Sequence, residues 1–161
     1  MIENGREKGS MNHQKGFTML EGVMVFAIIA IVAAIAVPQF RKMAINGNLK
    51  AAAKDMVSDF SYMRERAISE NTSLSIFFDT THHTYTVPYP GGKVKTPASF
   101  SSDINITGVN FTDGGTTLTF QTRGTISPPG TNTITLTNGR GSTATITVLT
   151  AGRIYVQYSL Q

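Results

Sequence analysis

The sequence contains no cysteine. Disulfides, cysteine-based metal sites and cysteine nucleophiles are therefore excluded along the whole chain. Charged residues are also scarce, since they make up 15% of the sequence where about a quarter is usual. With 3 histidines and 10 carboxylates, the chain has few groups from which an active site could be built.

The sequence also lacks the motifs of common enzyme classes. It has no Gly-x-Ser-x-Gly elbow, no phosphate-binding loop and no His-Glu-x-x-His. His82 and His83 are the one conspicuous histidine pair, but adjacent residues of a strand point to opposite faces, so they do not readily share a metal. We expect them in a solvated loop. The chain is predicted not to be an enzyme, with no catalytic residue, no metal and no cofactor.

The composition changes along the chain and divides it into four segments. Residues 1–16 are polar, residues 17–40 are almost wholly apolar, and residues 41–70 are charged and helix-prone. Residues 71–161 are rich in threonine and glycine, which favour strands and turns. The predicted fold class is therefore α+β, with a long N-terminal α-helix packed on a C-terminal antiparallel β-sheet domain.

The apolar run from Gly22 to Phe40 contains no ionisable residue. As a helix it would be about 28 Å long, close to the thickness of a hydrocarbon core. A secretory signal peptide would have a shorter apolar region that ends at a cleavage site. A buried core helix would need a larger domain around it than residues 71–161 provide. A membrane-inserted helix is the favoured interpretation of the three.

Glu21 is the one charged residue at the start of this apolar helix. A carboxylate costs roughly 2.5–3.5 kcal/mol near the bilayer centre and less near an end. One interpretation places Glu21 at the interface, where it is tolerated. The other gives it a positive partner, such as the α-amino group of a neighbouring chain.

The second half of the helix carries an apolar stripe with spacings of three and four residues, as an amphipathic helix requires. The charged residues of this segment, such as Lys54, Asp55, Asp59 and Arg64, are expected on solvated faces. The stripe is expected to pack on the sheet, and it consists of Ile45, Leu49, Ala53, Met56, Phe60, Met63 and Ala67.

Short runs of β-prone residues separated by turn signals predict the strands. The clearest hairpin joins Thr133–Thr137 to Thr143–Leu149 through Asn138-Gly139-Arg140-Gly141. The predicted strands are Leu74–Phe78, Thr84–Pro88, Ile104–Ile106, Val109–Phe111, Thr117–Phe120, Thr133–Thr137, Thr143–Leu149 and Arg153–Tyr158.

The segment Lys15-Gly16-Phe17-Thr18-Met19-Leu20-Glu21, followed by the apolar run, closely resembles the class III signal of type IV pilins and pseudopilins. The resemblance implies a pilin fold. It also implies that a prepilin peptidase cuts between Gly16 and Phe17 and methylates the amine of Phe17. By the same resemblance Glu21 serves filament assembly, and Pro38 matches a proline that kinks the helix.

The resemblance implies that the four segments of the chain have different roles. Residues 1–16 would be a class III prepilin leader and residues 17–40 a helix for membrane and filament core. Residues 41–70 would be an amphipathic helix, and residues 71–161 a periplasmic antiparallel β-domain. A leader that starts at Met11 would have a more common length than one that starts at Met1, and the sequence leaves both starts open.

The β-domain resembles the minor pseudopilin H of type II secretion and the related minor pilins of the FimT/FimU type. The resemblance rests on YMRERAISENTSLSIFF, on the turn from Phe120 to Gly124 and on Gly152-Arg153. It implies a minor pseudopilin that starts or caps a periplasmic pseudopilus, with a minor pilin of a type IV pilus as the alternative. Other pseudopilins or pilins of a hetero-oligomeric filament tip, the prepilin peptidase and the bacterial inner membrane are the implied partners.

Some minor pilins of this branch bind DNA through a Gly-Arg-x-Arg stretch near the C-terminus. This sequence has Gly152-Arg153-Ile154-Tyr155, with tyrosine in place of the second arginine. Arg140 and Arg153 offer at most a weak DNA contact, and a net charge of +4 does not by itself indicate nucleic acid. The favoured role of Arg153 is to satisfy local carbonyls at a strand end, and nucleic acid is not expected as a partner.

Overall fold

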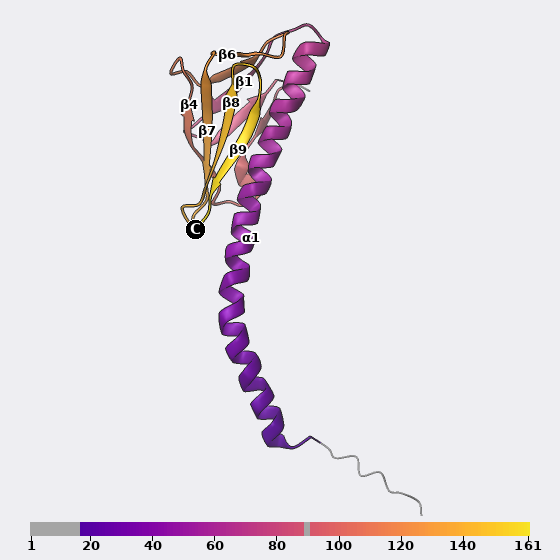
Figure 1. Cartoon of the computed structure of the whole chain (residues 1–161), viewed down its shortest axis with the longest axis vertical. Coiled ribbons are helices and arrows are strands. Elements are labelled where there is room, and N and C mark those ends of the chain that lie inside the picture. Colours follow the sequence, from indigo (N-terminus) through magenta and orange to yellow (C-terminus); the bar gives the residue numbers. More distant parts are fainter. Residues whose placement is uncertain (1–16, 89–90) are drawn as a thin grey trace, which may run out of the picture. The chain divides into compact units, whose positions relative to one another are not determined.

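The structure is a computed structural model that describes residues 17–88 and 91–161. One long helix, α1 (Met19–Ser69), precedes the strands β1 to β9 and a single-turn helix, η1 (Pro97–Ser99). The chain forms two compact units, Met1–Gln39 and Phe40–Gln161. The described part of the first unit is the apolar part of α1, and the second unit holds the rest of α1 and all the strands (Figure 1).

The C-terminal end of α1 is closed by hydrogen bonds that a Schellman motif provides. The Thr72 amide donates to the Ala67 carbonyl at 3.2 Å, and the Asn71 amide donates to the Ile68 carbonyl at 3.3 Å. Asn71 adopts the left-handed conformation that this motif needs, with φ of 51°. These bonds satisfy two of the carbonyl groups that the end of the helix would otherwise leave without a partner.

The first sheet is antiparallel and has the strand order β3-β2-β1-β5-β6. In its centre β1 pairs with both β2 and β5, so that Phe77 lies opposite Thr86 on one side and Thr117 on the other. The strands are β1 (Leu74–Asp79), β2 (Thr84–Val87), β3 (Lys93–Lys95), β5 (Thr117–Phe120) and β6 (Ile126–Ser127).

The second sheet is also antiparallel, with the order β4-β7-β8-β9, and these strands lie side by side in Figure 1. Ile146 of β8 pairs with Ile134 of β7 and with Val156 of β9, so apolar side chains line one face. Threonines alternate with them and line the other face. The strands are β4 (Asn105–Asn110), β7 (Thr131–Thr137), β8 (Thr143–Leu149) and β9 (Ile154–Ser159).

Most predicted strands are present, and the hairpin of β7 and β8 has the predicted turn. The two segments predicted at Ile104–Ile106 and Val109–Phe111 are instead one strand, β4, whose register shifts between Ile106 and Gly108. The prediction missed β3 and β6, because two or three residues are too few to show an alternating pattern.

The core of the second unit lies between the helix and the sheets. Phe60 is fully buried, and its ring lies 6.1 Å from the ring centroids of both Phe78 and Phe120. The predicted stripe is buried from Leu49 to Ala67, Ala52 joins it, and Ile45 is half-buried. Helical periodicity therefore located the helix side of the core correctly.

Replacing Phe60 by alanine should lower the free energy of unfolding of the second unit by about 3–5 kcal/mol, because it leaves a cavity among packed rings. Urea unfolding of the full chain in detergent, followed by circular dichroism, measures this loss. Phe77→Ala is the matched control, since Phe77 is 53% exposed. It should cost less than half as much, and equal losses would contradict this description of the core.

Candidate functional site

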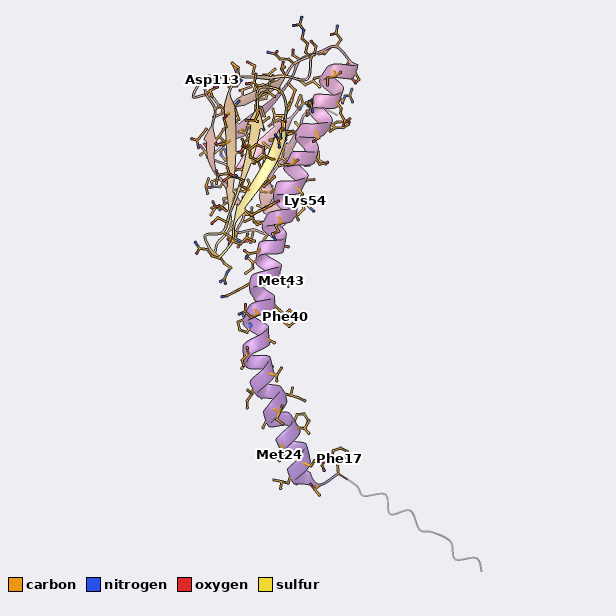
Figure 2. All side chains as sticks on the ribbon, in the orientation of Figure 1. Phe17, Met24, Phe40, Met43, Lys54 and Asp113 are labelled. Atoms are coloured by element: carbon orange, nitrogen blue, oxygen red, sulfur yellow. The ribbon has the colours of Figure 1, made fainter. Side chains whose placement is uncertain are left out.

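The described part of the first unit, residues 17–39, exposes apolar side chains on every side of the helix. Phe17 is 81% exposed and Phe26 is 74% exposed. In Figure 2 the side chain of Met24 projects from α1, and that of Phe17 projects from the chain just before the helix. By length and composition α1 can cross a membrane, and none of its apolar window is buried within the protein. This surface is the main candidate functional site of the chain.

Exposing the apolar side chains of residues 17–39 to water is strongly unfavourable in free energy. Burying one large aliphatic or aromatic side chain contributes roughly 1.5–3 kcal/mol, so the exposed side chains together amount to tens of kcal/mol. Most backbone groups of this segment are hydrogen-bonded within the helix, so its main chain adds only a small polar penalty when the segment enters hydrocarbon. Lipid or other apolar helices are the environments that would cover it.

Thr18 caps the start of α1. Its Oγ1 accepts a hydrogen bond from the backbone amide of Glu21 at 3.2 Å, which satisfies one of the free amides of the first turn. The pattern Thr-x-x-Glu is that of a capping box. No prediction is made for Thr18 from the sequence, although this four-residue pattern is a local signal for a helix start.

Glu21 is exposed in the first turn of α1. Among the described residues, no cationic side chain lies within salt-bridge distance of it. The stretch from Phe17 to Gln39 contains no Lys, Arg or His at all. No side chain of residues 17–39 can therefore serve as a positive partner for this carboxylate. Such a partner must be another kind of group, or must come from elsewhere.

Pro38 lies inside α1 as predicted. Because proline has no amide hydrogen, the carbonyl of Ala34 loses its usual helical donor there. The division between the two compact units falls just after it, at Gln39 and Phe40. The predicted cleavage position at Gly16 and the predicted leader lie outside the described residues.

A polar cluster links the helix to strand β3. The ammonium of Lys95 lies 2.6 Å from a carboxylate oxygen of Asp55 and 2.6 Å from one of Asp59. The Tyr85 hydroxyl donates to Asp59 at 2.7 Å. The prediction that Asp55 and Asp59 are simply solvated is therefore wrong, because β3 places a lysine over them that the strand prediction had not identified.

The cluster changes the protonation of two of its members. Burial, followed by the hydrogen bond to Asp59 and its charge, raises the pKa of Tyr85 far above its ordinary value. Burial by itself would lower the pKa of Lys95, but its hydrogen bonds with Asp55 and Asp59 outweigh that effect and raise it. Tyr85 therefore stays neutral and Lys95 stays charged well above neutral pH.

The two histidines lie in a turn between β1 and β2. His82 is exposed as predicted, and its Nδ1 lies 2.6 Å from Asp79, which lowers the pKa of that carboxyl group. His83 is half-buried instead of solvated, and its Nδ1 lies 2.9 Å from the carbonyl oxygen of Ile106. Across the part of the chain that the structure describes, no three acidic or histidine side chains form a metal-binding group.

Arg140 and Arg153 lie in turns at opposite ends of strand β8 (Thr143–Leu149). A seven-residue strand spans about 23 Å at 3.3 Å per residue, so the two side chains do not form one patch. Both are exposed, and the guanidinium of Arg153 lies 6.0 Å from the Tyr155 ring centroid. This separation argues against a shared site for phosphate groups.

Two glycines and an arginine join the helix to both sheets. Arg64 Nε donates to the carbonyl of Gly124 at 3.2 Å, in the turn between β5 and β6. Gly152, in the turn between β8 and β9, has φ of +73°, and a Cβ there would collide with that same carbonyl oxygen. The sequence predicts Arg64 on a solvated face, but its side chain is half-buried. It contacts the two turns that hold Gly124 and Gly152.

Comparison with known proteins identifies the family. The sequence model described as Type II transport protein GspH matches residues 52–152, well over half of the chain. The chain belongs to the GspH family. A second model, the prokaryotic N-terminal methylation motif, matches residues 11–37 of this GspH-family protein.

Solved structures share the fold of the GspH-family chain. The type IV minor pilin FimU of Pseudomonas aeruginosa strain PAO1 is 21% identical, with a TM-score of 0.51 over 70% of this chain and 90% of that chain. The minor pseudopilin EpsH from the type 2 secretion system of Vibrio cholerae is 11% identical, with a TM-score of 0.53 over 68% of this chain and 96% of that chain. The predicted pilin fold, a long N-terminal helix on antiparallel sheets, is confirmed.

These findings describe a type IV pilin-like minor subunit. Proteins of the GspH family and its pilin relatives are structural subunits and not enzymes. The apolar N-terminal helix of this member fits a membrane-anchored protein, and the methylation motif fits processing by a prepilin peptidase and assembly into filaments.

The polar cluster predicts a loss of stability at high pH. Above about pH 10 an unfolded tyrosine loses its proton, whereas folded Tyr85 keeps it, so the folded state binds more protons and stability falls as pH rises. Each such group contributes a slope of up to about 1.4 kcal/mol per pH unit. Urea unfolding between pH 9 and 11 should show this decline, with a shallower slope in Tyr85→Phe. Tyr155→Phe is the control, and an equally shallow slope in it would contradict the assignment.

Gly152→Ala should lower the free energy of unfolding by more than about 2 kcal/mol, because it combines left-handed strain with a collision against the Gly124 carbonyl. Gly114→Ala separates these effects, since Gly114 has φ of +71° and open space around it. It should cost about 1 kcal/mol. Thermal or urea unfolding compares the two, and similar losses would show that the contact of the two turns is unimportant.

Proposed function

We propose that this protein is a minor pseudopilin of a type II secretion system, a structural subunit that starts or caps a short periplasmic pseudopilus. The match of residues 52–152 to the GspH family carries this proposal. The methylation motif over residues 11–37 supports it at the other end of the chain.

Processing precedes assembly in this proposal. The prepilin peptidase removes residues 1–16 by cutting between Gly16 and Phe17, and the new amine of Phe17 is methylated. Residues 17–40 then hold the protein in the bacterial inner membrane. The amphipathic helix of residues 41–70 and the β-domain of residues 71–161 lie in the periplasm.

The first turn of α1 gives this assembly its register. Cleavage would create a cationic amine on Phe17, close to a carboxylate on Glu21 that has no cationic side chain in residues 17–39. A buried charge without a partner is strongly disfavoured. In a bundle of apolar helices, the amine of one subunit therefore pairs with Glu21 of its neighbour, and Pro38 allows the helix to bend as it packs.

The second candidate function is that of a minor pilin in a type IV pilus. The structural likeness to FimU, with a TM-score of 0.51, is close to the likeness to EpsH, with a TM-score of 0.53. Both machines would use the same N-terminal segment. DNA uptake through Arg140 and Arg153 has little support, because β8 separates the two side chains.

Crosslinking in native membranes, with mass spectrometry of what a tagged copy captures, distinguishes the two candidates. Pseudopilins and the outer-membrane secretin are expected partners under the leading proposal. Major pilin and pilus-tip subunits would overturn it in favour of the pilus.

Replacing Glu21 by valine should leave membrane insertion and cleavage unchanged but reduce co-assembly by roughly tenfold or more, because the neighbour's amine loses its partner. Co-purification of processed subunits after crosslinking measures this. Glu65→Val is the matched control, since Glu65 is exposed on the same helix in the second unit. Normal assembly of the Glu21 variant would reject the pairing.

A further inference from the structure

The second unit has a group of exposed cations where the apolar helix ends. Arg41 and Lys42 follow Phe40 directly, and both are exposed. Between Arg41 and Lys54 the sequence contains no acidic residue. In Figure 2, Phe40 and Met43 mark this end of the second unit, and Asp113 lies at the opposite end.

A distant turn brings a third cation to the same end. The side chain of Asn46 holds the turn between β7 and β8, because its Oδ1 accepts from Ser142 Oγ at 2.9 Å and from Asn138 Nδ2 at 3.2 Å. Arg140 lies at the tip of this turn, and its backbone amide donates to Asn138 Oδ1 at 3.1 Å. Arg140 is therefore held in a turn that contacts Asn46, and its side chain is exposed. We call Arg41, Lys42 and Arg140 the basic collar.

The basic collar keeps its charge available. None of its members lies within salt-bridge distance of a described carboxylate. Asp103 is the acidic residue next to the turn, and its carboxylate is engaged by Ser101 Oγ and by the Gly139 amide. Lys50 adds positive charge one helical turn beyond Asn46, although its ammonium lies 5.8 Å from the Tyr158 ring centroid.

The short distance of these cations from Phe40 along α1 indicates the class of ligand that they can bind. At 1.5 Å per residue, Arg41 and Lys42 lie within about 3 Å of Phe40 along the helix and Asn46 lies about 9 Å from it. The headgroup region of a bilayer is about 5–8 Å deep on each side. Long basic side chains bend their charged ends toward such an interface.

We propose that the basic collar binds the phosphate groups of anionic phospholipids in the leaflet next to the second unit. This binding holds the β-domain against the membrane before assembly, with the turn of Arg140 facing the lipid. Extraction of the subunit into a filament then requires these contacts to break. The inference uses the membrane-spanning role of residues 17–40 from the proposed function, but not the identity of the machine.

The absence of native cysteine makes a direct test available. The full chain carries one introduced cysteine, Ser102→Cys, labelled with a fluorophore. Ser102 is exposed beside Asp103, next to the turn of Arg140. The labelled protein is reconstituted in two kinds of vesicle, one of zwitterionic lipid and one of zwitterionic lipid with one third phosphatidylglycerol. Both kinds contain a quencher of the fluorophore at the level of the lipid headgroups. The label at Thr116→Cys, in the loop that follows Asp113, serves as the distant reference.

The Ser102 label should be quenched more strongly in the anionic vesicles, and the Thr116 label should not respond. Arg140→Gln should shift the docking equilibrium about fivefold toward the undocked state. Arg153→Gln, an equal charge change in the turn at the other end of β8, should leave it unchanged. Salt at 1 M, which shortens the screening length to about 3 Å, should abolish the lipid dependence.

Each contrary result has a distinct meaning. Equal quenching in both kinds of vesicle, or equal effects of the two arginine variants, would overturn the proposal while the span and the pseudopilin assignment stand. A chain that carbonate washes from both kinds of vesicle would overturn the membrane anchor, and with it the proposed function as well. Capture of secretion partners in cells, together with unchanged quenching, would overturn the basic collar alone.

Discussion

The second unit depends on one apolar stripe of α1. The side chains from Leu49 to Ala67 on this stripe are buried, and they pack with side chains from both sheets in a single core. Neither sheet could bury its inner face without this helix, because a sheet with one apolar face needs a covering layer. The other contacts, including the polar cluster at Lys95 and the junction at Gly152, fix how the elements are placed around this stripe.

The same helix has a different surface in the first unit, where apolar residues occupy every side. The contrast is a matter of periodicity. A stripe repeated every three or four residues matches one packed face, while an unbroken apolar run matches an apolar solvent or a bundle of like helices. One continuous element thus combines a part that folds against its own chain and a part whose environment other molecules supply.

The fold could be predicted from the sequence to the extent that local patterns specify it. The stripe, the apolar run and the hairpin of β7 and β8 were predictable because each repeats with the period of its own element. Strands β3 and β6 were not, since two or three residues carry no period. The division into two sheets depends on pairings between distant strands, such as β1 with β5, that no local pattern contains.

The residues of the candidate site also differ in whether their roles could be predicted from the sequence. Roles for Phe17, Glu21 and Pro38 could be predicted from the sequence because these residues stand in a linear motif. The roles of Asp59, Arg64 and Asn46 could not, because each contacts a residue at least 26 positions away in the chain. A charged or polar residue on a helix looks solvated in the sequence whenever its partner comes from a turn or an edge strand.

The placement of α1 along the sheets also bears on mechanical load (Figure 1). In the filament assembly that we propose, load would reach the β-domain through α1. A pull along the axis of α1 strains the contacts from Leu49 to Ala67 together, in shear, whereas a pull across the axis would separate them one after another. The β-domain of such a subunit should therefore resist force along the axis of α1 far better than force directed across it.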